Sequence, residues 1–307
     1  MVNKMATILL VLVALTAARP GFAADQGRGN IRKDKKEIMR LASKSDFFTS
    51  FLTGTKKKSN SAPVAESLQT TEGSADGTAI LPERWWRKLD GEPVRNWSIT
   101  VIGDTATASV VTDADATLYV DTTHDGVSNP GTKPIEDRIT RYSTWVKTDG
   151  KWKLAEVSPA QVNLREISHQ TVSITEVKVW VNGQLVWDVT DPTDKLSVDT
   201  EIVRVHSGDV VTVESAVANS SQSGLDPLTY VYCHPNRPSG RRDLMFDDGV
   251  NGADKVAGDG IWTYQYTVDL KSGVHFAAVD ALDSLCLQNE TDDDYNSAAW
   301  GMPYVVE

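Results

Sequence analysis

Two short turn signals constrain the fold of this chain more than any other feature. Asp149-Gly150 separates residues 139–147 from residues 151–157, and Asn182-Gly183 divides the run 172–189. In all of these runs apolar and polar residues alternate, which is the pattern of a half-buried strand. Two consecutive positive φ angles suit Asp-Gly and Asn-Gly, so both pairs predict two-residue β-hairpins. We therefore expect a chain rich in antiparallel sheet.

Further alternating runs extend this pattern on both sides of the two hairpins. The runs 96–102 and 105–111 flank Gly103-Asp104 and predict another hairpin, which continues into a strand at 117–120. After residue 170 the composition is all-β, because short strands follow one another with Gly, Asn and Asp turns between them. The strands predicted there, besides the second hairpin, cover residues 201–206, 210–217, 228–233, 261–268, 273–280 and 304–306.

Helical signals are confined to the first third of the chain. Ile38, Leu41 and Phe48 recur at near-helical spacing, which predicts a helix over residues 31–53. A second, short helix is predicted over residues 80–89, opened by Pro82 and packing its tryptophans on a sheet. The polar residues between them predict a mobile linker. We accordingly divide the chain into an N-terminal helix and linker at 24–78, an α+β domain at 79–165 that includes the first helix, and an all-β domain at 170–307.

The first 23 residues have the features of a secretory signal peptide. Lys4 precedes a short apolar run at residues 8–18, and Gly21 and Ala23 are small residues suited to a cleavage site. The apolar run is short for a transmembrane segment, and no other long apolar run follows. We therefore expect a periplasmic or extracellular protein. An oxidising compartment favours a disulfide between Cys233 and Cys286.

The charge of the chain restricts its partners. The formal net charge is -11 at pH 7. Such a balance argues against nucleic acid or an anionic membrane as the main partner. Basic residues concentrate in the N-terminal segment, where a solvated helix face explains them. We expect instead a protein or glycan partner, whose identity the sequence does not reveal.

One stretch resembles a known fold family. Residues 138–159 contain RYSTWVKTDGKWKLAEVSP, which resembles the closing hairpin of NTF2-like (SnoaL/ketosteroid-isomerase-like) domains. The resemblance covers residues 31–160 and implies a cone-shaped α+β fold. A long polar insert before Glu83 and a calcium-loop-like stretch at Asp121 depart from the family pattern. Because the family includes enzymes, binders and assembly modules, the fold would not define the function.

A catalytic pocket in such a cone would need a convergent acid or histidine. The available polar residues are Asp137, Arg138 and Tyr142 on the predicted strand, with His124 in the preceding loop. None of them aligns with an inward-facing position of the family enzymes. Asp137 and Arg138 are expected to form a surface pair, and we predict no catalytic residues here. Cys233 beside His234 is a poor dyad as well, since adjacent strand residues point to opposite faces.

An acidic, glycine-rich loop at residues 246–263 has the first half of an EF-hand pattern. It departs from that motif because its third position is Gly249 and its twelfth is Gly258, which offer no side-chain ligand. An irregular oxygen cage for Ca²⁺ is one interpretation, with the ligands Asp247, Asn251, Asp254 and Asp259. The alternative is a set of Asx turns, in which Asp and Asn side chains cap backbone amides. No other cofactor is predicted.

The same loop carries a second resemblance. DDGVNGADKVAGDGIWT is similar to the signature of Ig-like domains in exported bacterial proteins, including the choice-of-anchor X type. This resemblance covers residues 200–285 and implies a β-sandwich without enzymatic activity. The expected fold class is therefore an α+β NTF2-like cone domain followed by an all-β immunoglobulin-like sandwich.

Three functions are compatible with this organisation. We expect an exported, non-enzymatic binding protein or an envelope-associated protein. The first alternative is a small-molecule enzyme that uses the cone pocket, which requires a deep apolar cavity lined by acids or a histidine. The second is a carbohydrate-binding module, for which Trp180 and Trp187 would have to be exposed on one face of the sandwich.

Overall fold

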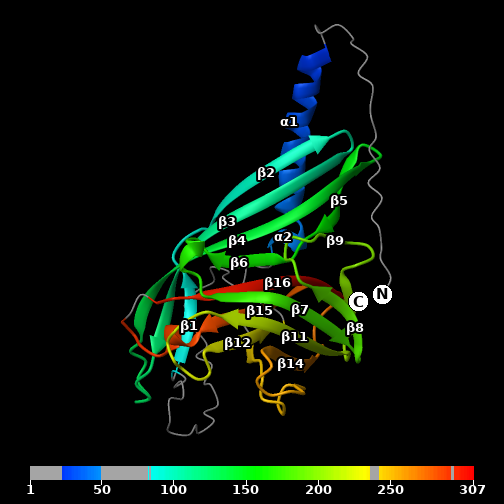
Figure 1. Ribbon diagram of the computed structural model, residues 1–307. Coiled ribbons are helices and arrows are strands. Elements are labelled where there is room, and N and C mark those ends of the chain that lie inside the picture. The colour runs from blue at the N-terminus through cyan, green and yellow to red at the C-terminus, as the bar shows by residue number, and fades with distance from the viewer. Residues whose placement is uncertain (1–22, 50–81, 83, 236–241, 292–293) are drawn as a thin grey trace, which may run out of the picture.

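The protein consists mainly of antiparallel β-structure with few helices (Figure 1). A computed structural model describes residues 23–49, 82, 84–235, 242–291 and 294–307. Within these residues the strands form a twelve-stranded sheet, much of which is strongly curled, and a separate four-stranded sheet. The predicted signal peptide, except for Ala23, and the linker after Thr49 lie outside the described residues.

Two helices precede the sheets. Helix α1 spans Ala23–Ala42 and the single turn α2 spans Asp46–Thr49, so the helix predicted over residues 31–53 starts earlier and is interrupted. Ile38 and Ala42 of α1 and Phe48 of α2 are buried in one cluster with side chains of the large sheet, including Ile99 and Trp145. The N-terminal part of α1 extends beyond the sheet (Figure 1).

A four-stranded meander forms the helix-covered part of the large sheet. The first hairpin predictions are confirmed, and Asp149 and Gly150 have φ angles of 51° and 74°. The strands predicted at 105–111 and 117–120 are one continuous strand of 17 residues, paired with a neighbour of 18 residues. The elements of the meander are β2 (Val94–Ile102), β3 (Thr105–Asp121), β4 (Gly131–Thr148) and β5 (Lys151–Val157).

The segment predicted as a helix at residues 80–89 contains a strand, so that prediction was wrong. Strand β1 spans Arg84–Leu89 and pairs with the second half of β3, from Asp121 to Ala116. The first half of β3 pairs with β2. Because β3 is longer than β2, its second half has a free edge, and β1 pairs with that edge. The backbone hydrogen bonds between β1 and β3 override the helical preference of residues 80–89.

The large sheet continues from the meander into the C-terminal half of the chain. Its order is β1-β3-β4-β6-β16-β15-β12-β13, so β6 joins β4 to β16. The large sheet thus contains strands from both sides of the predicted boundary between residues 165 and 170. The additional strands are β6 (Ala160–Leu164), β9 (Leu196–Ser197), β10 (Val203–Val205), β12 (Thr229–His234), β13 (Asp243–Leu244), β15 (Gly273–Asp283) and β16 (Ser297–Val306). Short 3-10 helices lie at Ile167–His169 and Ser284–Leu287.

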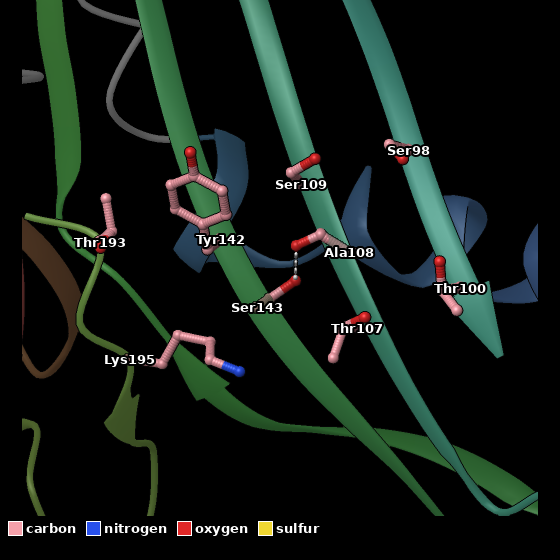
Figure 2. A pocket seen from close by; sticks show the side chains of 9 residues that line it. All are labelled: Ser98, Thr100, Thr107, Ala108, Ser109, Tyr142, Ser143, Thr193 and Lys195. Carbon is pink, nitrogen blue, oxygen red and sulfur yellow. Dashed lines mark hydrogen bonds between the residues drawn. The ribbon is translucent and has the colours of Figure 1, made fainter. Parts of the chain in front are cut away.

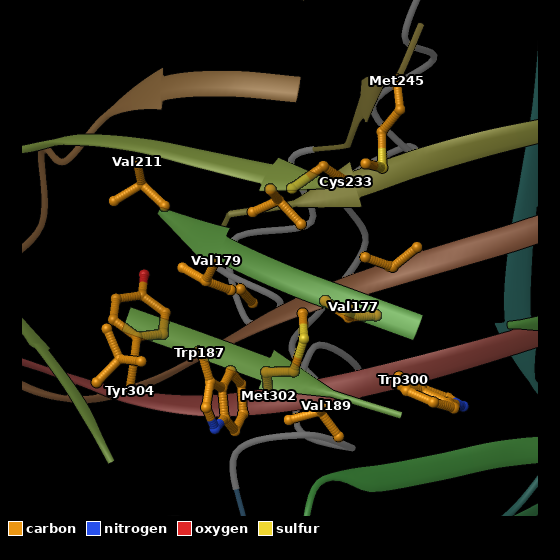
Figure 3. Close-up of a cluster of buried hydrophobic side chains, with 14 of the residues drawn as sticks. Val177, Val179, Trp187, Val189, Val211, Cys233, Met245, Trp300, Met302 and Tyr304 are labelled. Carbon is orange, nitrogen blue, oxygen red and sulfur yellow. The ribbon is translucent and has the colours of Figure 1, made fainter. Parts of the chain in front are cut away.

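The four-stranded sheet packs on the C-terminal part of the large sheet. Its order is β14-β11-β7-β8, and the φ angles of Asn182 and Gly183, 50° and 80°, confirm the β7–β8 hairpin. Side chains from both sheets, among them Val179, Trp187 and Trp300, form one apolar core (Figure 3). The strands are β7 (Val172–Val181), β8 (Gln184–Val189), β11 (Val210–Asn219) and β14 (Ile261–Thr267).

The predicted disulfide does not form. Cys233 lies on β12 in the core between the two sheets, whereas Cys286 lies in the second 3-10 helix among the side chains inside the curled sheet. Tyr232, the neighbour of Cys233, faces the interior that contains Cys286. Because consecutive strand residues point to opposite faces, Cys233 is turned away from its expected partner. The separation of the two cysteines in the sequence does not show on which face of the sheet each of them lies.

Candidate functional site

An open groove of about 430 Å³ lies on the face of the meander opposite the helices. Figure 2 shows its floor, where side chains of β2, β3 and β4 lie next to one another, and its wall, where the segment before β9 approaches. Most of these side chains end in a hydroxyl group. The groove is lined by Ser98, Thr100, Thr107, Ala108, Ser109, Tyr142, Ser143, Thr193 and Lys195.

The hydroxyl groups of the floor are arranged in two rows. Ser98 pairs with Ser109, and Ser109 pairs with Tyr142 on the next strand. Thr100 pairs in the same way with Thr107, which pairs with Thr144. Neighbouring strands are about 4.8 Å apart. The strands thus hold the hydroxyls at regular intervals across the floor.

Strand alternation places these hydroxyls on the outer face. In β3 the sequence Thr-Ala-Thr-Ala-Ser begins at Thr105, and its alanines, Ala106 and Ala108, are buried under the helices. In β2, Ile99 is buried on that same side. Since side chains of successive residues point to opposite faces, the intervening Ser and Thr residues face the groove.

Five hydroxyls of the floor have no protein partner within the described part of the chain. No hydrogen bond joins Ser98, Thr100, Thr107, Ser109 or Tyr142 through its side chain to another described residue. Ser143 differs, since its hydroxyl donates to the carbonyl of Ala108 and accepts from the indole of Trp145. The groove therefore presents donors and acceptors that are available to a ligand or to water.

One cationic side chain lies at the end of the groove. Lys195 Nζ donates to Thr144 Oγ1 at 2.6 Å and lies 3.6 Å from a carboxylate oxygen of Glu156. Its side chain is 32% exposed, so it can still contact a ligand. The described lining includes neither a carboxylate nor an imidazole nor a thiol. The hydroxyl groups and the single ammonium group can hydrogen-bond a polar ligand.

The polar residues considered for catalysis do not come together. Tyr142 lines the groove, but Arg138 binds the carboxylate of Asp113 on β3 at 2.7 Å rather than that of Asp137. Asp137 is half-buried on the opposite face of β4, where its charge acts on Arg87. His124 is exposed in the loop after β3. The predicted surface pair of Asp137 and Arg138 is therefore wrong.

A buried ion pair inside the curled sheet was not predicted. The guanidinium of Arg87 on β1 donates to both carboxylate oxygens of Asp280 on β15, at 2.6 and 3.2 Å. Asp280 is 1% exposed, and His234 Nε2 lies 3.5 Å from it. Burial alone would lower the pKa of Arg87, but the Asp280 carboxylate raises it above its ordinary value. The Arg87–Asp280 pair links β1 to β15, which are not adjacent in the sheet, and only the Nε group of Arg87 lacks a described hydrogen-bond partner.

The carboxylates of the acidic loop cap backbone amides. Asp247 accepts from the amides of Asp259 and Gly260 at 3.1 and 3.0 Å, and Asp254 accepts from Gly249 at 2.6 Å. Asp259 accepts from Ile261, while the Asn251 amide group donates to Asp248. These are the contacts of Asx turns. Among the described residues no group of three or more His, Cys, Asp or Glu side chains is arranged to hold a metal ion; the Ca²⁺ site stays a prediction.

The two tryptophans considered for carbohydrate binding lie apart. Trp187 is buried in the core between the sheets, 6% exposed. Trp180 follows the core residue Val179 on β7 and is half-buried on the other face of the four-stranded sheet. The two rings therefore do not form a common platform.

Comparisons with known proteins leave the chain unassigned. No protein-family model matches the sequence, and no curated protein matches it significantly. Of the helices that the structure describes, none has the length and apolar character needed to cross a membrane.

Proposed function

We propose that this chain is an exported, non-enzymatic binding protein and that the hydroxyl-lined groove takes a saccharide chain. The observation that carries the proposal is the double row of hydroxyls on the floor of the groove, in which five side chains have no described protein partner. A glycan partner agrees with the acidic charge of the whole chain, which disfavours nucleic acid.

The chemistry of the groove suits a polyhydroxylated ligand. A serine or threonine hydroxyl both donates and accepts, so a row of them matches the hydroxyl groups of a sugar without requiring one fixed polarity. The half-buried ring of Tyr142 offers an apolar face with a polar tip. Lys195 adds an ammonium donor at one end, which can hydrogen-bond a sugar oxygen.

The space beneath the meander supports a binding role over an enzymatic one. Trp145 and Trp152 on the helix side of the sheet are 2% and 3% exposed, and Ile38 of α1 packs against them. An enzyme of NTF2-like type would need an open, acid-lined cavity there. We infer an NTF2-like unit from the helix-covered meander and an Ig-like sandwich from the face-to-face sheets, and both agree with a carrier of binding surfaces.

Glycan binding is testable with paired variants of the full chain. Thr107→Val combined with Ser109→Ala removes one hydroxyl from each row and keeps the shape of the floor. Screening against immobilised acidic and neutral polysaccharides, followed by calorimetry on the best binder, should give at least a tenfold weaker affinity for the variant.

Ser173→Ala is the matched control, because Ser173 is an exposed hydroxyl residue on β7, outside the groove. It should bind like the unmodified chain. Binding that survives in the double variant, or a chain that binds no polysaccharide at all, would contradict the proposal.

A further inference from the structure

The outer edge of β2 is an unpaired strand edge. β2 pairs with β3 over all of its nine residues without a bulge. Among the described residues no other strand pairs with it, and no further backbone hydrogen bond involves it. An edge of this length without a bulge presents a row of amide and carbonyl groups to solvent.

β2 also lacks the features that usually protect a free edge. Such edges carry lysines, prolines or bulges that prevent pairing with another chain. The sequence of β2 is Val-Arg-Asn-Trp-Ser-Ile-Thr-Val-Ile, and Arg95 is its sole charged residue. Its two ends are apolar and exposed, with Val94 at 61% and Ile102 at 76%.

The β2–β3 turn determines which backbone groups point outward. Gly103 and Asp104 form a two-residue turn, so the flanking residues Ile102 and Thr105 form a hydrogen-bonded pair. Along β2 the even-numbered residues then bond to β3. The amides and carbonyls of Arg95, Trp97, Ile99 and Val101 point away from the sheet.

This pattern is self-complementary, and we propose that β2 pairs antiparallel with β2 of a second copy of the chain. A two-fold axis at Ser98 sets Trp97 opposite Ile99 of the partner subunit and Arg95 opposite Val101 of the partner subunit. All the outward groups then meet outward groups, as a hydrogen-bonded ladder requires. Every residue of the strand finds a partner in this register.

The side chains are compatible with the same register. The two copies of Arg95 lie at opposite ends of the paired strands, so no like charges face each other. The hydroxyl side of the sheet continues across the axis, where Ser98 meets its own symmetry copy. The second copy is favoured over an unrelated extended peptide because this single register pairs the whole strand and continues the row of Ser98, Ser109 and Tyr142 across the axis. The pairing does not depend on what the groove binds.

The central serine offers a test by charge. Sedimentation of the full chain should show a monomer–dimer equilibrium, with a dissociation constant on the order of micromolar for an interface of this small size. Ser98→Lys places two ammonium groups opposite each other and should raise that constant at least tenfold, as should Ser98→Glu. An equal mixture of the two variants should recover the dimer as a heterodimer.

Ser173→Lys is the matched control, since Ser173 is an exposed serine on β7, outside the groove and on a different sheet from β2. It should dimerise like the unmodified chain, and circular dichroism confirms that each variant is folded. A chain that stays monomeric at tens of micromolar would overturn the proposal. So would variants at Ser98 that dimerise normally, or whose mixture fails to recover the dimer. A failure of the chain to bind glycans would not affect the proposal that β2 pairs with a second copy.

Discussion

The outer face of the meander and the interior of the curled sheet use polar side chains in opposite ways. Both regions are built on the long strands β3 and β4. In the interior, Arg87 is paired with Asp280, and Lys133 with Asp294 at 2.5 Å. On the outer face most hydroxyls of the groove have no described protein partner. Buried polar groups must be paired for the fold to be stable, whereas exposed unpaired ones are available to a ligand.

Breaking the interior pair should have the largest effect on stability. Asp280→Ala leaves the Arg87 guanidinium buried without its carboxylate. We expect a loss of about 3–5 kcal/mol in the free energy of unfolding, measured by urea denaturation. Asp113→Ala removes the carboxylate of the exposed Arg138 pair and should cost about 0–1 kcal/mol. Equal losses in the two variants would contradict the distinction between the regions.

A smaller effect is expected where a loop packs against the start of β4. A Cβ atom on Gly131 would lie 2.1 Å from the carbonyl oxygen of Glu290, so the backbone must shift. Gly131→Ala should lower the free energy of unfolding by about 1–3 kcal/mol. Gly91→Ala is the control, because nothing lies within 4 Å of its added Cβ. An unchanged free energy of unfolding in Gly131→Ala would show that the contact between Gly131 and Glu290 is loosely packed.

The contact of helix α1 with the meander should respond to pH. Burial raises the pKa of Asp34, but hydrogen bonds from Lys147 and Trp152 outweigh burial and lower it below 3.8. The carboxylate therefore stabilises the fold above that value, and its contribution is lost as the pH falls through the lowered pKa. Asp34→Asn should cost about 1–2 kcal/mol at neutral pH. At a pH below the lowered pKa of Asp34, hydrogen exchange of the α1 amides should be similar in the unmodified chain and in Asp34→Asn. A difference that persists at that pH would show that the charge of Asp34 is not the cause.

Removing hydroxyls from the outer face should have the smallest effect. Thr100→Val with Thr107→Val keeps the branched shape at exposed positions, and neither hydroxyl bonds to a described residue. The free energy of unfolding should change by less than about 0.5 kcal/mol, measured in the same urea titration. A larger loss would mean that the rows stabilise the sheet and are not reserved for a ligand.

Local signals in the sequence predicted most of the strands. Asp149-Gly150 and Asn182-Gly183 identified their hairpins because the positive φ angles they favour are a property of the turn itself. Helix α1 was found through its apolar spacing. The shared sheet was not, since the pairing of β6 with β4 and β16 depends on contacts between residues far apart in the chain.

The candidate site was missed for a related reason. The alternation of Thr and Ala from Thr105 shows that one face of β3 is polar, but a polar face is the ordinary state of a half-covered sheet. What distinguishes the groove is the register that aligns Ser98 with Ser109 and Tyr142. The disulfide prediction failed for the same reason, because the face of β12 on which Cys233 lies cannot be read from the sequence.

The position of β16 has a consequence for the order of assembly. This strand lies between β15 and β6 and also pairs with β10, yet it follows all the other described strands in the sequence. During synthesis the ribosome delivers the middle of the sheet last, so the two halves remain unjoined until then. Such a chain is poorly suited to folding stepwise as it emerges.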